Sequence, residues 1–121
     1  GALKGRWLAG VVWSLVLDDG RTFPLSASDV ALGRNPSSAA VAAQLLPIPD
    51  TTRTLSKTHA RLTLDDGRWT ITDLGSTNGV LVVGEDDAET LIEPSTPTIL
   101  AGRFILGEVG MRIDHEQPTL S

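Results

Sequence analysis

Three short stretches of the chain together supply a group of hydrogen-bond donors and positive charges. They are Gly33-Arg34, the segment 53–59 (Arg-Thr-Leu-Ser-Lys-Thr-His) and the segment 73–79 (Asp-Leu-Gly-Ser-Thr-Asn-Gly). Arginine offers a two-pronged guanidinium that fits a phosphate or a carboxylate, and lysine offers a point charge. Together with hydroxyl groups, these side chains would line a cationic pocket that prefers a dianion. A phosphorylated side chain, with about −1.5 to −2 charges near neutral pH, is such a ligand.

The rest of the chain must position these stretches. In most of it, apolar and polar residues alternate with a period of two, which is typical of β-strands. Asp-Gly turns at 18–20 and 66–67 separate apolar runs and predict hairpins, and Pro24 favours a sheet edge or a strand end. We expect strands at 11–17, 21–25, 30–33, 60–65, 69–72, 80–83, 99–100, 104–106 and 111–113. Many short strands with frequent turns predict an all-β fold, a β-sandwich with Trp69 and Trp13 in its core.

The segment 36–50 (Pro-Ser-Ser-Ala-Ala-Val-Ala-Ala-Gln-Leu-Leu-Pro-Ile-Pro-Asp) does not alternate. Ser37 or Ser38 could cap a short helix that runs through Leu46 and ends at Pro47. A plain loop is the alternative, and the sequence does not choose between them.

Length and composition narrow the classes of protein. A chain of 121 residues with 40% hydrophobic and 21% charged residues predicts one globular domain. The net charge of −5 argues against duplex nucleic acid as a partner, and 4% aromatic residues argue against a stacking surface for single strands. The absence of cysteine excludes a disulfide framework and a thiolate zinc site. With two histidines and no metal-ligand spacing, we expect no metal and no cofactor.

Apolar runs are much shorter than the roughly 20 residues needed to cross a bilayer. We expect a cytoplasmic domain without membrane contact. Its expected organisation is an N-terminal extension at 1–10, a β-sandwich domain at 11–113 and a frayed tail at 114–121. Trp7 lies in the extension, and the sequence does not say whether it packs on the domain.

The order and spacing of the donor-rich stretches resemble a known family. Gly33-Arg34, then Ser56-x-x-His59, then Ser76-Thr-Asn-Gly79, with Trp69-Thr-Ile-x-Asp73 before the last motif, resembles the signature of the forkhead-associated (FHA) domain. The resemblance spans residues 30 to 83. It implies a two-sheet β-sandwich of mostly antiparallel short strands, whose loops at one end bind phosphothreonine in a partner protein. It also implies a non-catalytic adaptor in signalling or scaffolding, with a Ser/Thr kinase or a kinase substrate as the phosphorylated partner.

The resemblance assigns roles to individual residues. Phosphate contacts fall to four side chains: Arg34, Ser56, Lys57 and Thr77. Asn78 would hold the peptide backbone, and Gly33, His59 and Gly79 would be architectural. Three further loop residues are candidates for selecting the flanking sequence: Arg53, Thr54 and Leu74. The chain departs from the family pattern in the long spacing between Arg34 and Ser56, and in Val80, where many members have threonine.

Each motif residue also has a plain structural interpretation. Arg34 could form a surface ion pair with Asp29 or Asp50, and Lys57 could be only a solvated charge. Ser56 could cap a local turn. The sequence Thr77-Asn-Gly79 is a good turn in its own right. A structural or oligomerisation β-sandwich with no phosphate dependence is therefore the alternative function.

A hydrolase is the third class of function. Ser56, His59 and Asp73 supply the residue types of a catalytic triad. However, the chain has no strand-turn-helix Gly-x-Ser-x-Gly context, and a serine and a histidine three apart near a strand would point to different faces. We therefore expect no enzymatic activity and interpret His59 as a buried, hydrogen-bonded histidine.

Overall fold

The computed structural model describes residues 11–116, which form eleven β-strands and no helix. The strands are β1 (Val12–Leu17), β2 (Thr22–Leu25), β3 (Asp29–Gly33), β4 (Gln44–Pro47), β5 (Ala60–Asp65), β6 (Arg68–Asp73), β7 (Val80–Val83), β8 (Glu89–Leu91), β9 (Thr98–Ile99), β10 (Phe104–Leu106) and β11 (Val109–Glu116). All nine predicted strands are present within a few residues of their expected limits. Strands β4 and β8 were not predicted. The described residues contain no helix that is long and apolar enough to span a membrane.

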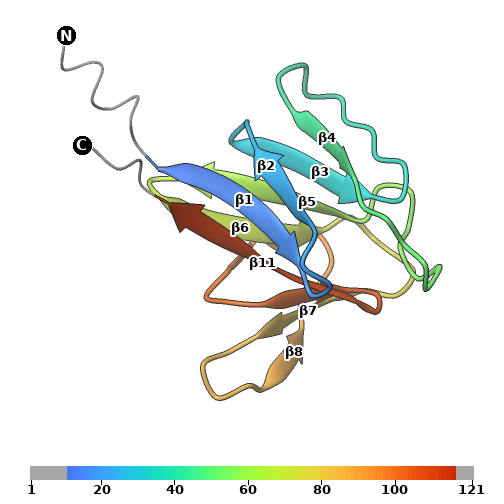
Figure 1. The fold of residues 1–121 in the computed structure, drawn as a ribbon. Coiled ribbons are helices and arrows are strands. Elements are labelled where there is room, and N and C mark those ends of the chain that lie inside the picture. Colours follow the sequence, from blue (N-terminus) through green and yellow to red (C-terminus); the bar gives the residue numbers. More distant parts are fainter. Residues whose placement is uncertain (1–10, 117–121) are drawn as a thin grey trace, which may run out of the picture.

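The strands form two sheets that pack face to face (Figure 1). One sheet has the order β2-β1-β11-β10-β7-β8, and the other has the order β4-β3-β5-β6-β9. Every pairing is antiparallel except that of β3 with β4. The predicted two-sheet β-sandwich is confirmed.

The alternation along the strands builds the core between the sheets. In β6, Trp69 and Ile71 are buried while Thr70 and Thr72 are half-buried on the other face. The side chains from both sheets that are fully buried include Leu15, Val30, Leu32, Leu62, Ile71, Val80, Phe104, Leu106 and Met111. Trp69 is 5% exposed, as predicted, and Trp13 packs on it edge-on with ring centroids 5.8 Å apart. The core therefore holds both sheets rigidly and leaves the connecting loops to carry the site.

The helix considered for segment 36–50 does not form. Residues 34–43 are a loop, and Gln44–Pro47 form the edge strand β4. Pairing with β3 buries the side chain of Leu46 against the core, which a short alanine-rich helix at the surface would not do. Ser38 accepts the N–H of Ala40 in a local turn, so it does not cap a helix.

Strand β11 is longer than predicted. Residues 114–116 pair with Val12, Trp13 and Ser14 of β1, so they belong to the sheet and not to the expected tail. The polar residue types of this segment suggested a frayed end, but the cross-strand partner decides the outcome. The expected extension at 1–10, with Trp7, and residues 117–121 lie outside the described residues.

One side chain joins the two sheets at their edges. The Gln44 amide donates from Nε2 to the backbone oxygen of Pro24 (2.9 Å) and accepts the N–H of Ser26 at Oε1 (2.8 Å). Gln44 begins β4, whereas Pro24 lies in β2, the edge strand of the other sheet. The two hydrogen bonds thus close the sandwich on the side where neither edge has a further strand.

We predict that Gln44→Ala lowers the free energy of unfolding by about 1–3 kcal/mol, because each net hydrogen bond contributes about 0.5–1.5 kcal/mol. Urea unfolding followed by tryptophan fluorescence measures the change. The matched control is Leu45→Ala, which truncates a 49% exposed side chain in the same strand and should change stability by about 0.5 kcal/mol or less. Equal effects of the two substitutions would contradict the bridge.

Candidate anion-binding site

Three loops meet at one end of the sandwich and surround a cavity of about 390 Å³. Its lining consists of Arg34, Arg53, Thr54, Leu55, Ser56, Lys57, Thr77 and Asn78. The structure therefore brings together all four predicted phosphate ligands, the predicted peptide-backbone ligand and two of the three specificity candidates. Leu74, the third candidate, is exposed at the start of the loop after β6 and is not part of the lining.

Backbone hydrogen bonds join the loop after β3 to the loop before β5. The Arg34 N–H donates to the Ser56 oxygen, and the Asn35 N–H donates to the Lys57 oxygen, both at 3.0 Å. The loops approach so closely at Gly33 that a Cβ there would lie 2.0 Å from the Lys57 oxygen. Glycine is therefore required at position 33, where the chain passes close to the loop before β5 just ahead of Arg34.

The hydroxyl of Ser56 joins the second loop to the third. Its oxygen accepts the backbone N–H of Thr77 at 3.1 Å. Since the oxygen acts as acceptor here, the hydroxyl proton is available for an acceptor in the cavity. Ser56 thus does not cap a local turn; its partner lies 21 residues away.

The side-chain amide of Asn78 forms a hydrogen bond through its nitrogen but not through its oxygen. Its Nδ2 donates to the Thr54 oxygen at 2.9 Å, which holds the third loop against the second. Within residues 11–116, its Oδ1 has no hydrogen-bond partner. The open oxygen is an acceptor that suits the N–H of a peptide backbone.

His59 is fully buried between the two loops. Its Nδ1 accepts the backbone N–H of Ser56 at 3.0 Å, so the ring carries its proton on Nε2. That Nε2 lies 2.8 Å from the Gly79 oxygen, to which it donates. The imidazole is thus a brace that joins the two loops through hydrogen bonds to their backbones.

The same contacts leave no catalytic triad. Both ring nitrogens of His59 bind backbone groups, and the Ser56 hydroxyl binds Thr77. The third candidate, Asp73, is 2% exposed and accepts the N–H of Ser76 at 2.9 Å. Its carboxylate therefore shapes the loop after β6 and does not orient the imidazole.

The positive charges of the site are not neutralised by the protein. The four ion pairs among residues 11–116 are Arg21–Asp19, Arg61–Asp29, Arg103–Asp18 and Arg112–Asp114. Arg34, Arg53 and Lys57 form none of them, although the chain is acidic overall. Asp29, one proposed partner of Arg34, instead binds Arg61 with two hydrogen bonds of 2.7 Å. Three unpaired cations around one cavity form a site of strong positive potential.

Asp50, the other proposed partner of Arg34, has a role that the sequence analysis missed. Its Oδ1 accepts the N–H groups of Thr52 and Arg53 and the Thr52 hydroxyl, and its Oδ2 accepts the N–H of Leu55. Burial tends to raise the pKa of Asp50, but the hydrogen bonds to the carboxylate outweigh it and hold the pKa below its ordinary value. The carboxylate thereby fixes the loop that presents Arg53 in a left-handed conformation (φ 61°). An aspartate two residues before a turn is the signal that could have found it.

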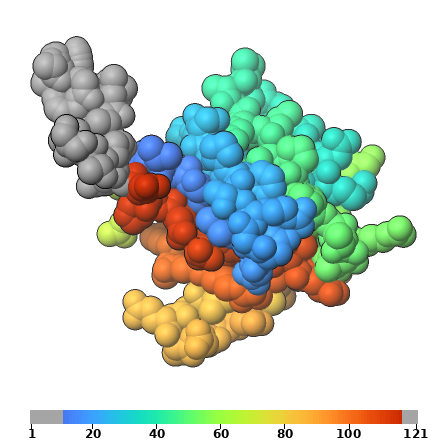
Figure 2. Space-filling model, in the orientation of Figure 1, coloured from blue at the N-terminus to red at the C-terminus, as the bar shows by residue number. Residues whose placement is uncertain are grey.

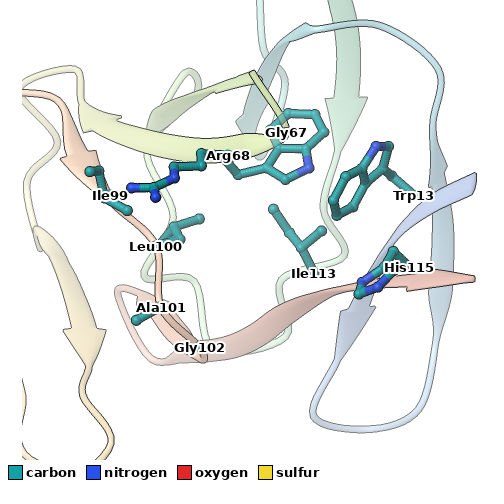
Figure 3. Close-up of a pocket in the computed structure, with 10 residues that line it drawn as sticks. Trp13, Gly67, Arg68, Ile99, Leu100, Ala101, Gly102, Ile113 and His115 are labelled. Carbon is teal, nitrogen blue, oxygen red and sulfur yellow. The ribbon is translucent and has the colours of Figure 1, made fainter. Parts of the chain in front are cut away.

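A second hollow of about 430 Å³ lies at the other end of β6 (Figure 3). Arg68 and Ile99 border one side of it, and Trp13 and His115 border the other. The buried indole N–H of Trp69, which also lines the hollow, has no hydrogen-bond partner among the described residues. Because Arg68 is the single arginine or lysine that lines this hollow, the hollow does not match the donor-rich loop end as an anion site.

Comparisons with known proteins agree with this geometry. The family profile of the FHA domain matches residues 30–106, and the chain belongs to the FHA domain family. No curated protein sequence matches the chain.

Solved FHA domains share its fold. The FHA domain of FhaA, solved with the intracellular domain of Rv3910, is 26% identical and has a TM-score of 0.59, with 84% of this chain and 99% of that chain covered. An FHA domain from a study of phosphothreonine-dependent FHA interactions has the same identity and TM-score, with 91% and 98% covered. The FHA domain of human APLF, in complex with an XRCC1 bisphosphopeptide, is 20% identical with a TM-score of 0.65, with 90% and 99% covered, and supports the fold alone.

We predict that Asp50→Asn lowers the free energy of unfolding by about 1–3 kcal/mol at pH 7, because it removes the charged acceptor from the N–H groups of Thr52, Arg53 and Leu55. The pKa of Asp50 is lowered in the folded protein, so its stabilising effect is complete above pH 3.8 and is lost as the pH falls through the lowered pKa. Thermal unfolding at pH 7 and pH 3 should therefore show a smaller difference between the variant and the parent protein at pH 3.

The matched control for Asp50→Asn is Asp29→Asn, which breaks an ion pair outside the loop and should cost about 1 kcal/mol or less. Amide hydrogen exchange should become faster at Thr52, Arg53 and Leu55 in Asp50→Asn alone. Unchanged protection of these three amides would show that Asp50 does not hold the loop.

Proposed function

We propose that this FHA domain binds phosphothreonine in partner proteins and performs no chemistry on it. The observation that carries the proposal is the cluster of Arg34, Arg53 and Lys57, which form no ion pair among the described residues and line one cavity with three hydroxyl side chains. A site with three positive charges on an acidic chain fits a dianionic ligand, and screening over about 8 Å limits the effect of distant acidic groups. The family match and the phosphothreonine-dependent relative support the same ligand.

Binding follows from the donors in the cavity. Arg34 binds two phosphate oxygens with its guanidinium, and the free hydroxyl proton of Ser56 donates to a third. Lys57 and the hydroxyl of Thr77 complete the set. Each charge-assisted hydrogen bond contributes about 1.5–3 kcal/mol, but ordering the peptide and removing water from the phosphate cost much of the sum. A dissociation constant near micromolar, or about −8 kcal/mol, results.

The peptide around the phosphothreonine is held by the loops. Asn78 accepts a backbone N–H of the peptide at its open Oδ1. The phosphate balances about two of the three positive charges, which leaves Arg53 to favour an acidic residue beside it. Thr54 and Leu74 are the other loop side chains positioned to select flanking residues.

The partner is a threonine-phosphorylated protein, such as a Ser/Thr kinase or its substrate, and the domain acts as an adaptor. Recognition without turnover fits the brace role of His59, whose two ring nitrogens are both engaged by the backbone. A purely structural role would require no phosphate dependence, and the experiments below test that difference.

We predict that Arg34→Ala weakens binding of a phosphothreonine peptide by at least about 30-fold, or roughly 2 kcal/mol, because it removes the bidentate contact. Isothermal titration calorimetry measures the change. Arg68→Ala is the matched control, since Arg68 is also unpaired but lies at the other end of the sandwich, and it should leave affinity unchanged. Unchanged affinity in folded Arg34→Ala would refute the assignment.

We also predict that binding weakens about tenfold between pH 7.5 and pH 5, because the phosphate gains a proton near pH 6 and loses part of its charge. Fluorescence anisotropy with a labelled phosphothreonine peptide measures this change, while tryptophan fluorescence verifies that the domain stays folded. A flat affinity across this range would count against a site selective for dianions.

A further inference from the structure

The hydroxyl of Thr54 lies in the middle of a row of hydrogen bonds beside the anion site. Its oxygen accepts the backbone N–H of Glu108 at 2.9 Å and lies 2.7 Å from the hydroxyl oxygen of Thr52. The Thr52 hydroxyl in turn donates to Oδ1 of Asp50 at 2.6 Å. Because a carboxylate only accepts, the single hydroxyl proton of Thr52 goes to Asp50. Thr54 is therefore the donor in the contact between the two hydroxyls.

The direction of this row leaves Thr54 without a free hydroxyl proton. The hydrogen bonds run from the turn between β10 and β11 through two hydroxyls to the carboxylate of Asp50. Hydrogen bonds in a row polarise one another, and a charged acceptor at the end strengthens them. Thr54 lines the cavity, but its hydroxyl is committed to the protein and not to a ligand.

The turn between β10 and β11 packs directly on Thr54. A Cβ on Gly107 would lie 2.5 Å from Oγ1 of Thr54 and 2.7 Å from its backbone oxygen, so only a glycine permits this approach. The Gly107 N–H also donates to the Gly79 oxygen at 3.2 Å. In Figures 1 and 2, the green loop before β5 and the orange-red turn between β10 and β11 lie at the same end of the molecule. The turn is thus a fourth element that contacts the loop before β5 and the loop after β6.

The backbone oxygen of Thr54 selects one orientation of the Asn78 side chain. A carbonyl oxygen can only accept, so the amide nitrogen of Asn78 must face it, and the two atoms are 2.9 Å apart. The amide oxygen of Asn78 is then presented on the other side of the planar amide group. If the Thr54 carbonyl moved away, the amide could turn over and offer N–H groups where a peptide N–H needs an acceptor.

We propose that Thr54 is a positioning residue for the peptide backbone. Its hydroxyl, held by the β10–β11 turn and by the row that ends at Asp50, fixes its carbonyl, and the carbonyl presents the amide oxygen of Asn78 to a bound peptide. The proposal rests on the phosphothreonine-binding function proposed above. Since the phosphate ligands are other side chains, the Thr54 hydroxyl should matter for a peptide and not for a phosphate without a peptide backbone.

The test replaces Thr54 by valine, which has nearly the same shape and no hydroxyl. Thr54→Val should bind a phosphothreonine peptide about five- to tenfold more weakly in isothermal titration calorimetry, the effect of about one hydrogen bond. Its affinity for phenyl phosphate, followed by NMR titration, should equal that of the parent domain. Thr54→Ser keeps the hydroxyl and should retain the parent affinity for both ligands.

Two controls separate action through Asn78 from a general effect. Thr98→Val removes a hydroxyl that donates to the Thr96 oxygen at β9, and it should leave the binding of both ligands unchanged. Asn78→Ala removes the group through which Thr54 acts. In the Asn78→Ala background, the further change Thr54→Val should not weaken peptide binding, because two residues that act as a unit are not additive.

The hydrogen bond that orients Asn78 is also measured in the parent domain, which does not depend on the folding of any variant. Asn35, the other asparagine of the chain, is exposed and serves as an internal reference. NMR should show slower exchange with water for the side-chain amide protons of Asn78 than for those of Asn35. In Thr54→Val, the two rates should become similar.

The outcomes distinguish the two proposals. If the parent domain binds no phosphothreonine peptide, the proposed function fails and the role of Thr54 in binding fails with it. If the parent domain binds, three results would each refute the role of Thr54 alone: an equal loss of peptide and phenyl phosphate in Thr54→Val, no loss of either, or full additivity with Asn78→Ala. Equally fast exchange of the Asn78 and Asn35 amides in the parent domain would refute it as well.

Discussion

The brace made by one buried histidine is the constraint on which the site depends. The loop before β5 and the loop after β6 have no strand pairing with each other at the cavity. His59 joins them by accepting the Ser56 N–H on one ring nitrogen and donating to the Gly79 oxygen from the other. His59 directly precedes β5, and its imidazole is fully buried at the end of the core. The ring, together with the hydrogen bonds from Thr77 to Ser56 and from Asn78 to Thr54, sets the distance between the two loops, and with it the shape of the cavity.

Around this brace, the charged side chains fall into two groups. The aspartates with an ion-pair partner bind arginines outside the cavity, whereas the cations that line the cavity form no ion pair among the described residues. Asp29 and Asp18 form ion pairs with arginines outside the cavity. The carboxylate of Asp50 accepts hydrogen bonds from backbone N–H groups. The cations of the cavity are therefore left without an internal competitor. Since the donors already line one cavity, an anion that binds there would require little rearrangement of the backbone, and less of the interaction energy would be lost to ordering.

Most of the fold and most of the residues that line the cavity could be predicted from the sequence, because they follow local rules. Alternation identifies β5 and β6, and short motifs identify Arg34, Ser56 and Asn78. Strand β4 was missed because its Leu-Leu-Pro sequence does not alternate and its partner, β3, is decided by packing. Strand β8 is exposed along its whole length and carries no apolar period, so only its pairing with β7 defines it.

The features that sequence reasoning missed share one property: each depends on a contact between residues far apart in the chain, or on a loop whose shape is set by such contacts. Gln44 binds β2 from the opposite sheet, and Leu91 covers Gly79 from the next hairpin. A motif gives the residues that touch the ligand, but it does not say which neighbours limit the space around them. In this domain, those neighbours come from edge strands, whose sequences are less restricted than core strands because one side of each remains free. Edge strands are therefore the part of the sandwich that sequence patterns define least.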